Sequence, residues 1–314
     1  MVWTNQTVSS GKLLLFVFLA AAVFVGLAAY GDFRNVGQRI ASFPISYLSA
    51  AIALAVLNFL LRFLRWSYYL KILKIDVPLK LSLLVFFSGL ALSITPGKLG
   101  ELVKAYFLNS RAGVRMALSI PAVLTERLTD VVAVVLLGLV GLALLPESTR
   151  WILVGVLALT GLLLCLLVSK HNVHLLRLPV LRRWRDEIQV SREGIRRLTT
   201  PKPLFVAISL GVLAWLCEGL AFWLILQGLD TEILVLQALP IYASATIVGA
   251  ITTLPGGLIG TEGTMLALLQ QAGVARDGAS AATLLVRLVT LWLAVGLGMV
   301  ALGVLNRRHS VGIE

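Results

Sequence analysis

Charged residues are scarce in this chain, at 13% of its 314 residues, about half the share found in ordinary soluble proteins. Acidic residues are the scarcest, with 15 Asp and Glu against 27 Lys and Arg. Apolar residues make up 59% of the chain, and its mean hydropathy is +0.94. So little charge cannot cover a water-soluble fold of this length, and so much apolar surface excludes a disordered chain. The composition therefore predicts an all-α polytopic membrane protein, with lipid as its outer solvent.

Cysteine and histidine are also rare. Cys165 and Cys217 are the only cysteines, and both lie inside apolar runs, which favours buried thiols over a disulfide scaffold. The three histidines, His171, His174 and His309, lie outside the apolar runs and lack the spacing of metal ligands. We therefore expect no metal and no cofactor.

The apolar runs are long enough for six full membrane spans, which need about 20 residues each. They cover 13–30, 45–70, 117–145, 151–168, 204–229 and 279–305. The first run is long for a signal peptide and is preceded only by Lys12, so we expect a retained anchor rather than a cleaved segment. Two further apolar segments are interrupted, at Pro96-Gly97 and at Pro255-Gly256-Gly257. Proline and glycine break helices, so each of these segments predicts a re-entrant helical hairpin.

Positive charge is distributed unevenly around these spans. The insert 170–202 holds nine Lys and Arg against three acids, which makes it cytoplasmic. The resulting map puts 17 Lys and Arg inside and four outside, with both termini cytoplasmic in a multi-pass cell-membrane protein. The net charge of +12 then indicates anionic lipid rather than nucleic acid as the partner. The insert forms either an amphipathic surface helix, with Leu175, Leu176, Leu178 and Leu181 on its apolar side, or a solvated loop.

The two interrupted segments resemble each other within a single transmembrane domain, 1–314. Pro96-Gly97 matches Pro255-Gly256 at an offset of 159, and Arg127 in the next span matches Arg287 at an offset of 160. The segments about 45–145 and 204–305 therefore predict two repeats, with chance similarity as the alternative. Three full crossings separate the breaks, so the second copy is inverted relative to the first. Inverted repeats with interrupted helices indicate a binding site at the bilayer midplane.

Ionisable residues at membrane depth are costly, so each is a candidate for a functional site. The candidates are Lys98, Glu101, Lys104, Glu126, Arg127, Asp130, Glu218, Glu262 and Arg287. One interpretation is internal ion pairing that holds the helices together. The other is a shared polar cavity in which Arg127 and Arg287 bind one phosphate, because the guanidinium fork suits phosphate oxygens.

The remaining candidates support these roles in different ways. The helix ends near Gly97 and Gly256 add free N–H groups to such a site. Glu101 and Glu262 neutralise the arginines when the site is empty, bind a proton, or hold a cationic part of the substrate. Glu218 is either a hydrogen-bonded acid or a proton carrier.

Position along the helix distinguishes the other charges. Glu126 and Asp130 share a helix face, and Arg127 is turned away from them. Arg62 and Arg65 lie near a span end, where their side chains can reach the interface.

The motifs 95–101, 126–130 and 254–262 resemble the lysylphosphatidylglycerol synthase transmembrane-region family, also called flippase-like or UPF0104. The resemblance covers about residues 40–305. It implies translocation of a lipid or glycolipid, since the best-known member flips aminoacylated phosphatidylglycerol. The soluble aminoacyl-transferase domain of some members is not found here, so we do not expect lipid synthesis.

The expected function is therefore a flippase for an anionic phospholipid or a polyprenyl-phosphate (glyco)lipid. The alternatives are an integral-membrane enzyme of lipid-phosphate metabolism and a non-transporting partner in a glycolipid pathway. A homo-oligomer is also left open.

Overall fold

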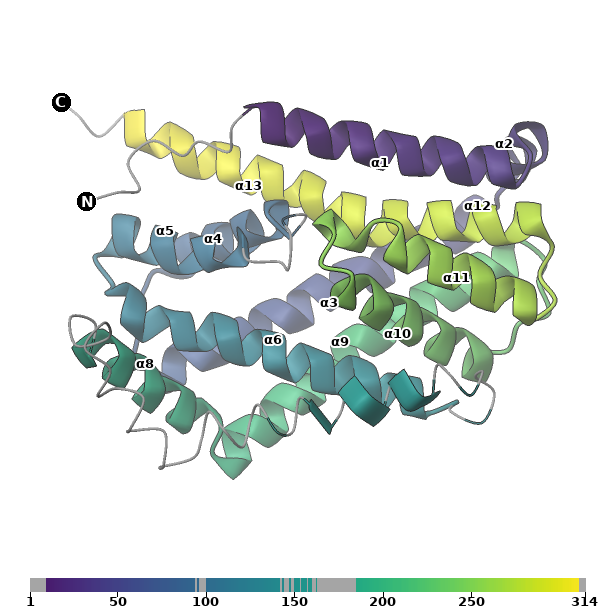
Figure 1. Cartoon of the computed structure of the whole chain (residues 1–314). Coiled ribbons are helices and arrows are strands. Elements are labelled where there is room, and N and C mark those ends of the chain that lie inside the picture. The colour runs from purple at the N-terminus through teal and green to yellow at the C-terminus, as the bar shows by residue number, and fades with distance from the viewer. Residues whose placement is uncertain are drawn as a thin grey trace.

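The computed structural model describes residues 10–93, 95, 100–141 and 185–310, together with 143, 147, 150–152, 154–156, 158–159 and 162. All regular structure within these residues is helical. The first half contains α1 (Ser10–Tyr30), α2 (Phe33–Ala41), α3 (Ile45–Ile72), α4 (Leu79–Ala91), α5 (Val103–Ala112) and α6 (Met116–Leu139). The second half contains α8 (Arg185–Leu198), α9 (Pro201–Gly228), α10 (Val235–Ile251), η5 (Pro255–Gly257), α11 (Gly260–Gln271), α12 (Arg276–Arg287), η6 (Leu288–Trp292) and α13 (Leu293–Ser310). Figure 1 shows these helices as one elongated bundle.

Three helical stretches in the described part of the chain are long and apolar enough to cross a membrane: α3, α9 and the continuous stretch Arg276–Arg307. A 28-residue helix such as α3 is about 42 Å long, more than the roughly 30 Å of a bilayer core. Helix α6 has 24 residues and is also long enough, but it carries Glu126, Arg127 and Asp130. These three charges lie among other helices rather than facing outward.

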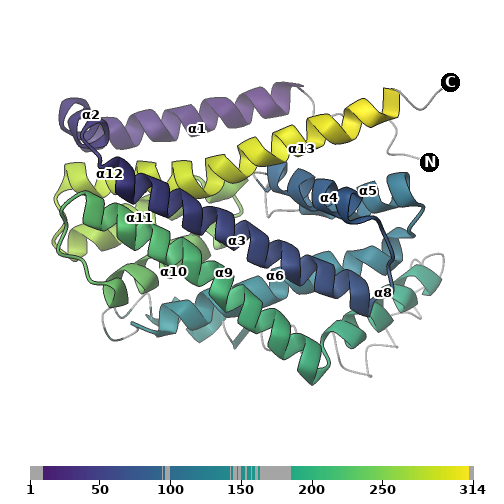
Figure 2. The ribbon, with the colours of Figure 1, turned by 180° about the vertical axis from the view of Figure 1, so that it is seen from behind.

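Two pairs of short helices fold back on themselves where the sequence predicts interrupted segments. Helices α4 and α5 form one pair and α10 and α11 the other, with the two helices of each pair in contact. In Figures 1 and 2 the pairs extend toward opposite ends of the bundle, and their connections lie toward its middle. Helix α5 begins at Val103 and ends at Ala112, about four residues later than the predicted stretch 99–108.

The break between α10 and α11 is a departure from helical backbone, as predicted. Gly256 and Gly257 have φ values of 64° and 68°, and the flanking Thr253 and Ile259 also have positive φ, at 53° and 70°. A β-branched residue rarely adopts this conformation, so the surrounding packing must hold the turn in place. Pro96 and Gly97 lie outside the described residues.

The packing between helices follows a reciprocal pattern. Helix α3 runs along α9, as Figure 2 shows. Helix α4 of the first hairpin packs on α13, and helix α10 of the second hairpin packs on α6. Helix α5 packs on α6, and α11 packs on α12. Exchanging α3 with α9, each hairpin with the other, and α6 with α12–α13 therefore leaves these contacts unchanged.

The turns after α3 and α9 show which residues of these two helices correspond. Each turn has six residues before the next helix begins. Lys74 in the first turn and Asp230 in the second both have positive φ, at 57° and 55°. The Ile75 N–H donates to the Leu70 carbonyl over 2.9 Å, and the Thr231 N–H donates to the Leu226 carbonyl over 3.1 Å. These matching features are separated by 156 residues, so α3 and α9 correspond at that offset.

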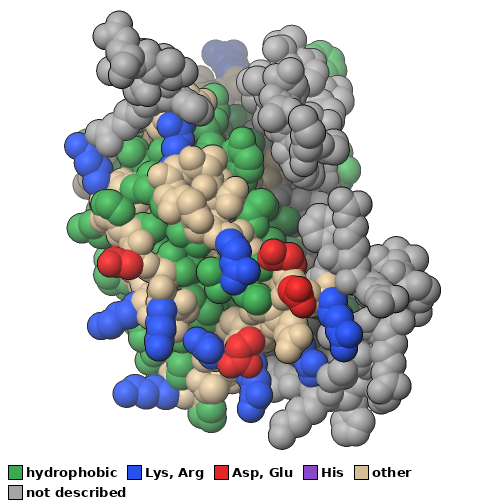
Figure 3. All heavy atoms as spheres, turned by 90° about the vertical axis from the view of Figure 1, so that its left-hand side faces the viewer, with side chains coloured by type: hydrophobic (Ala, Val, Ile, Leu, Met, Phe, Trp, Pro, Cys, Tyr) green, Lys and Arg blue, Asp and Glu red, His purple; other side chains and the backbone are tan. Residues whose placement is uncertain are grey.

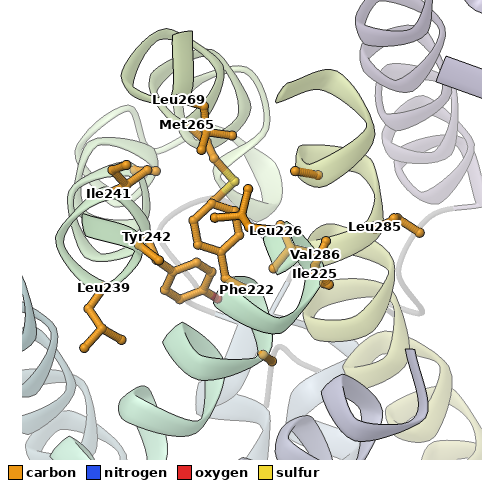
Figure 4. Packing of buried hydrophobic residues seen from close by; sticks show 14 of the residues in the cluster. Phe222, Ile225, Leu226, Leu239, Ile241, Tyr242, Met265, Leu269, Leu285 and Val286 are labelled. Carbon is orange, nitrogen blue, oxygen red and sulfur yellow. The ribbon is translucent and has the colours of Figure 1, made fainter. Parts of the chain in front are cut away.

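The largest hydrophobic core lies where α9, α10, α11 and α12 meet. Figure 4 shows Tyr242 of α10 beside Phe222 of α9, with Met265 of α11 nearby. The rings of Tyr242 and Phe222 have centroids 5.7 Å apart. This core holds the second hairpin against the long helices.

Two helices of the structure have no precise counterpart in the sequence predictions. Helix α2 follows Asp32, whose side chain accepts a hydrogen bond from the Arg34 N–H over 2.9 Å. Its sequence gives no signal of a span, because its nine residues mix polar with apolar side chains and bury only Val36. Helix α8 lies inside the basic insert and packs on α6 through Gly194, Ile195 and Leu198. The four leucines of the proposed surface helix lie outside the described residues, as does most of the span 151–168.

Candidate functional site

Seven ionisable side chains from α3, α5, the turn before α5, and α6 form one buried network, which we call the first cluster. Its members are Arg62, Arg65, Glu101, Lys104, Glu126, Arg127 and Asp130. Four are cations and three are carboxylates, so one positive charge is in excess when all are ionised. Buried charges of this kind persist only when they are paired, and each member has an opposite charge within 4 Å.

Arg65 and Lys104 are the most deeply buried cations of the first cluster. The Arg65 side chain is fully buried, and its Nη2 donates to Asp130 Oδ1 over 2.6 Å. Lys104 Nζ donates to Glu126 Oε2 over 2.5 Å and lies 4.9 Å from the ring centroid of Trp66. Asp130 also accepts a hydrogen bond from the indole N–H of Trp215 on α9. These contacts fix α3, α5, α6 and α9 relative to one another.

Arg127 is the most exposed member of the first cluster, with 22% of its side chain accessible. Its Nη2 lies 2.8 Å from Glu101, 3.2 Å from Asp130 and 3.4 Å from Glu126. The prediction that Arg127 is turned away from Glu126 and Asp130 is therefore wrong. Adjacent positions on a helix point in different directions, but the long arginine side chain folds back toward its neighbours.

A second group of polar side chains, which we call the second cluster, lies at the other hairpin and consists of Glu218, Tyr242, Glu262 and Arg287. Arg287 Nε lies 2.6 Å from Glu262 Oε1, and its Nη2 donates to the Gly256 carbonyl over 2.6 Å. The Tyr242 hydroxyl donates to Glu218 Oε2 over 2.6 Å. The arginine thus binds both the break itself and the helix that follows the break. A π-helical turn, η6, begins directly after Arg287, and such turns often occur at functional sites.

The two clusters share one arrangement. In each, a glutamate at the start of the second hairpin helix pairs with an arginine of the next long helix: Glu101 with Arg127, and Glu262 with Arg287. The glutamates are both 1% exposed, and none of their four carboxylate oxygens has a hydrogen-bond partner among the residues that the structure describes. These carboxylates are held by charge rather than by directed hydrogen bonds, which suits groups that another anion can replace.

Close packing at the hairpins also matches. A Cβ on Gly100 would lie 2.6 Å from the Leu92 carbonyl, and one on Gly260 would lie 2.7 Å from Thr252 Oγ1. Gly100 and Gly260 are 160 residues apart, the same offset as Arg127 and Arg287. Each glycine lets the second helix of its hairpin begin against the end of the first.

Not every predicted site residue is brought into one place. Arg127 and Arg287 do not converge on a common partner among the described residues, since each pairs with carboxylates of its own hairpin and helix. Two pockets of about 390 and 410 Å³ lie at the two ends of the bundle, and no cluster residue lines them. Lys98 lies outside the described residues.

Sequence reasoning missed three members of the clusters. Arg62 and Arg65 were interpreted as reaching the interface, but they are 8% and 0% exposed and pair with Asp130. Arg62 is ten residues from the end of α3, about 15 Å, which is too far for its side chain to reach water easily. That depth was the available signal. Tyr242 gave no signal, because an isolated tyrosine in an apolar run is ordinary.

Long apolar helices, folded-back helix pairs and paired buried charges define a multi-pass helical membrane protein. The sequence model of the family described as "Lysylphosphatidylglycerol synthase TM region" matches residues 13–298, and the chain belongs to this family. This confirms the resemblance of its motifs.

Three curated relatives are UPF0104 membrane proteins. A UPF0104 membrane protein of Methanothermobacter thermautotrophicus is 26% identical over 287 residues, covering 82% of this chain and 84% of that protein. A UPF0104 membrane protein of Pyrococcus horikoshii is 24% identical and covers 91% of this chain and 95% of that protein. One from Methanocaldococcus jannaschii is 23% identical, covering 69% and 94%.

Proposed function

We propose that this protein is a transporter that moves the head group of an anionic phospholipid or a polyprenyl-phosphate (glyco)lipid across the cell membrane. The observation that carries the proposal is the first cluster, in which four cations and three carboxylates leave one positive charge in excess. Arg127 has the most accessible side chain of the cluster, with its Nε and Nη2 buried against the carboxylates, and its guanidinium is the group that we assign to the phosphate. The tails of the lipid stay in the bilayer while the head group passes through.

The proposed route uses two inverted repeats, each with three parts: a long helix, a re-entrant hairpin and a second long helix. The reciprocal packing, the 156-residue match of the turns and the paired glutamates and arginines all support this symmetry. In such an arrangement one hairpin enters from each side of the membrane, so that a central site opens to either side in turn. Six full spans and cytoplasmic termini complete the proposed topology.

Charge at one end of the bundle supports this orientation. Figure 3 shows the end at which α5 and α8 lie, where Lys and Arg side chains outnumber Asp and Glu. In the proposed topology this end is cytoplasmic. A cysteine at Arg196, in a protein with Cys165 and Cys217 replaced by serine, should be labelled only from the cytoplasm, and one at Asp230 only from outside. Labelling of both positions from one side would refute the inverted repeats.

We favour transport over lipid-phosphate chemistry because of the groups that surround the arginines. In the described part of the chain the Arg127 guanidinium pairs with three carboxylates within 4 Å, and Arg287 contacts a carboxylate and a backbone carbonyl. Carboxylates this close to an arginine compete with a phosphate for it rather than attack the phosphorus. Glu101 and Glu262 therefore act as internal substitutes for the lipid phosphate when the site is empty.

The test is reconstitution of the purified protein into vesicles that contain fluorescent phosphatidylglycerol, with dithionite to quench the outer leaflet. Wild-type protein should make the inner-leaflet label accessible. Arg127→Ala should abolish this movement, and Arg127→Lys should fail almost as badly because an ammonium lacks the bidentate fork. Glu193→Gln, at an exposed side chain of α8, is the matched control and should move lipid normally. Wild-type rates in both Arg127 variants would overturn the proposal.

A further inference from the structure

The two repeats carry opposite charges at corresponding positions of their first long helices. At the 156-residue offset that their following turns establish, Arg62 of α3 corresponds to Glu218 of α9. The same offset matches buried neighbours of similar character, Trp66 with Phe222 and Leu70 with Leu226. Arg62 and Glu218 therefore occupy equivalent positions, and their opposite charges do not result from a wrong alignment of the two helices.

Each of these side chains belongs to the cluster of its own repeat. Arg62 adds a positive charge to the first cluster, 3.6 Å from Asp130 and 3.9 Å from Glu126. Glu218 adds a negative charge to the second cluster and is 7% exposed. The second repeat thus has a carboxylate, Glu218, at the position where the first repeat has a cation, Arg62, which attracts anions.

The groups around Glu218 come from several helices. From α10, Tyr242 donates its hydroxyl to the carboxylate, and that hydroxyl lies within electrostatic range of Arg287 on α12 and close to Thr290 of η6. Cys217 is adjacent on α9 itself.

The charged side chains of α3 and α6 contact α9 one to two helical turns before Glu218. Arg65 lies against Gly211, and Asp130 accepts from Trp215.

We propose that Glu218 binds a proton during each transport cycle, so that an anionic head group and one proton cross together. This inference rests on the proposed function. The head group neutralises the excess positive charge of the first cluster, and the proton neutralises the acid at the equivalent position of the second. Moving both together avoids carrying a net charge against the membrane potential.

The proton step is a simple exchange between oxygens. A hydronium ion on the loading side gives its proton to a carboxylate oxygen of Glu218, and water is left behind. The Tyr242 hydroxyl keeps its hydrogen bond, because the neutral acid still has an acceptor oxygen. When the site opens on the other side, the O–H bond of the acid breaks and water takes the proton.

The test uses phosphatidylcholine vesicles that hold a trace of fluorescent phosphatidylglycerol, with the membrane potential clamped to zero by valinomycin and potassium. A pH gradient should drive wild-type protein to concentrate the label in one leaflet. Coupling of one proton to one lipid sets the limit at about tenfold per unit of pH gradient. Glu218→Gln should still let the label exchange between leaflets but leave it evenly distributed, and Glu218→Asp should retain the response. Glu232→Gln, an exposed acid beyond the end of α9, should behave as wild type.

The outcomes separate the two proposals. If wild-type protein moves lipid but ignores the pH gradient, or if Glu218→Gln still concentrates the label, the proton proposal is overturned and transport stands. If wild-type protein moves no lipid, the proposed function itself is overturned. Should Glu218→Gln not fold, Tyr242→Phe provides the test. Loss of its hydrogen bond to the carboxylate should shift the half-maximal pH of transport upward, and an unchanged pH profile would refute the proposal.

Discussion

The two clusters share a glutamate–arginine pair at a helical hairpin but hold their charges differently. In the first cluster seven ionisable groups share partners, so that Asp130 contacts three arginines. In the second cluster, within the described residues, Arg287 has one carboxylate partner, Glu262, together with the carbonyl of Gly256. The first cluster has one surplus cation, so it can lose Arg127 and keep its remaining charges balanced, whereas a single pair can lose neither partner. The comparison thus predicts different consequences for equivalent substitutions.

The largest effect is expected at Asp130, the carboxylate on which the first cluster depends most. Asp130→Ala removes the 2.6 Å partner of Arg65, whose side chain is fully buried. Breaking a buried ion pair in this way costs roughly 3–5 kcal/mol of stability. Unfolding in mixed micelles, followed by circular dichroism, measures the loss. Glu193→Ala removes one side of the half-exposed Glu193–Arg197 pair and should cost less than about 1 kcal/mol. Equal losses in the two variants would contradict a buried network.

The second prediction separates the two arginines. Arg127→Ala leaves three cations and three carboxylates in the first cluster, so stability should change little while lipid transport is lost. Arg287→Ala leaves Glu262 buried without its cation, and both stability and transport should fall, stability by roughly 3–5 kcal/mol.

The double variant Arg287→Ala/Glu262→Gln is the control for this prediction, because it removes the stranded charge. It should recover most of the stability but none of the transport. If Arg127→Ala proves as unstable as Arg287→Ala, the first cluster does not tolerate the loss of a member, and the comparison fails.

The helical class and the two interruptions could be predicted from the sequence, because each depends on local rules. Apolar length predicts spans, and Pro255-Gly256-Gly257 breaks a helix in any surroundings. The pairing of Arg62 and Arg65 with Asp130 could not be predicted in the same way, since it depends on how α3 packs against α6. The expectation that Arg127 and Arg287 share one phosphate required the two side chains to meet in space. Their matching positions in the sequence cannot show whether they do.

The third prediction concerns the start of each second hairpin helix. Gly100→Ala and Gly260→Ala each place a Cβ within 2.7 Å of the preceding helix end. Overpacking of this kind costs typically 1–3 kcal/mol, so both variants should lose stability by similar amounts. Gly263→Ala, where a Cβ meets nothing within 4 Å, is the matched control and should be neutral or slightly stabilising. A loss at only one of the two glycines would show that the hairpins are built differently.

The smallest expected effect lies in the turns that relate α3 to α9. Lys74 and Asp230 have φ values of 57° and 55°, a conformation that glycine adopts without the steric cost other residues bear. Lys74→Gly and Asp230→Gly should therefore each change the free energy of unfolding by between zero and about +1 kcal/mol. The gain is small because relief of strain is partly offset by a more flexible unfolded chain. Lys71→Gly, one turn earlier in helical backbone, should instead cost about 1 kcal/mol. Thermal unfolding of the three variants side by side measures these differences. If Lys74→Gly and Asp230→Gly change stability in opposite directions, the two turns are not equivalent, and the 156-residue register that pairs Arg62 with Glu218 loses its support.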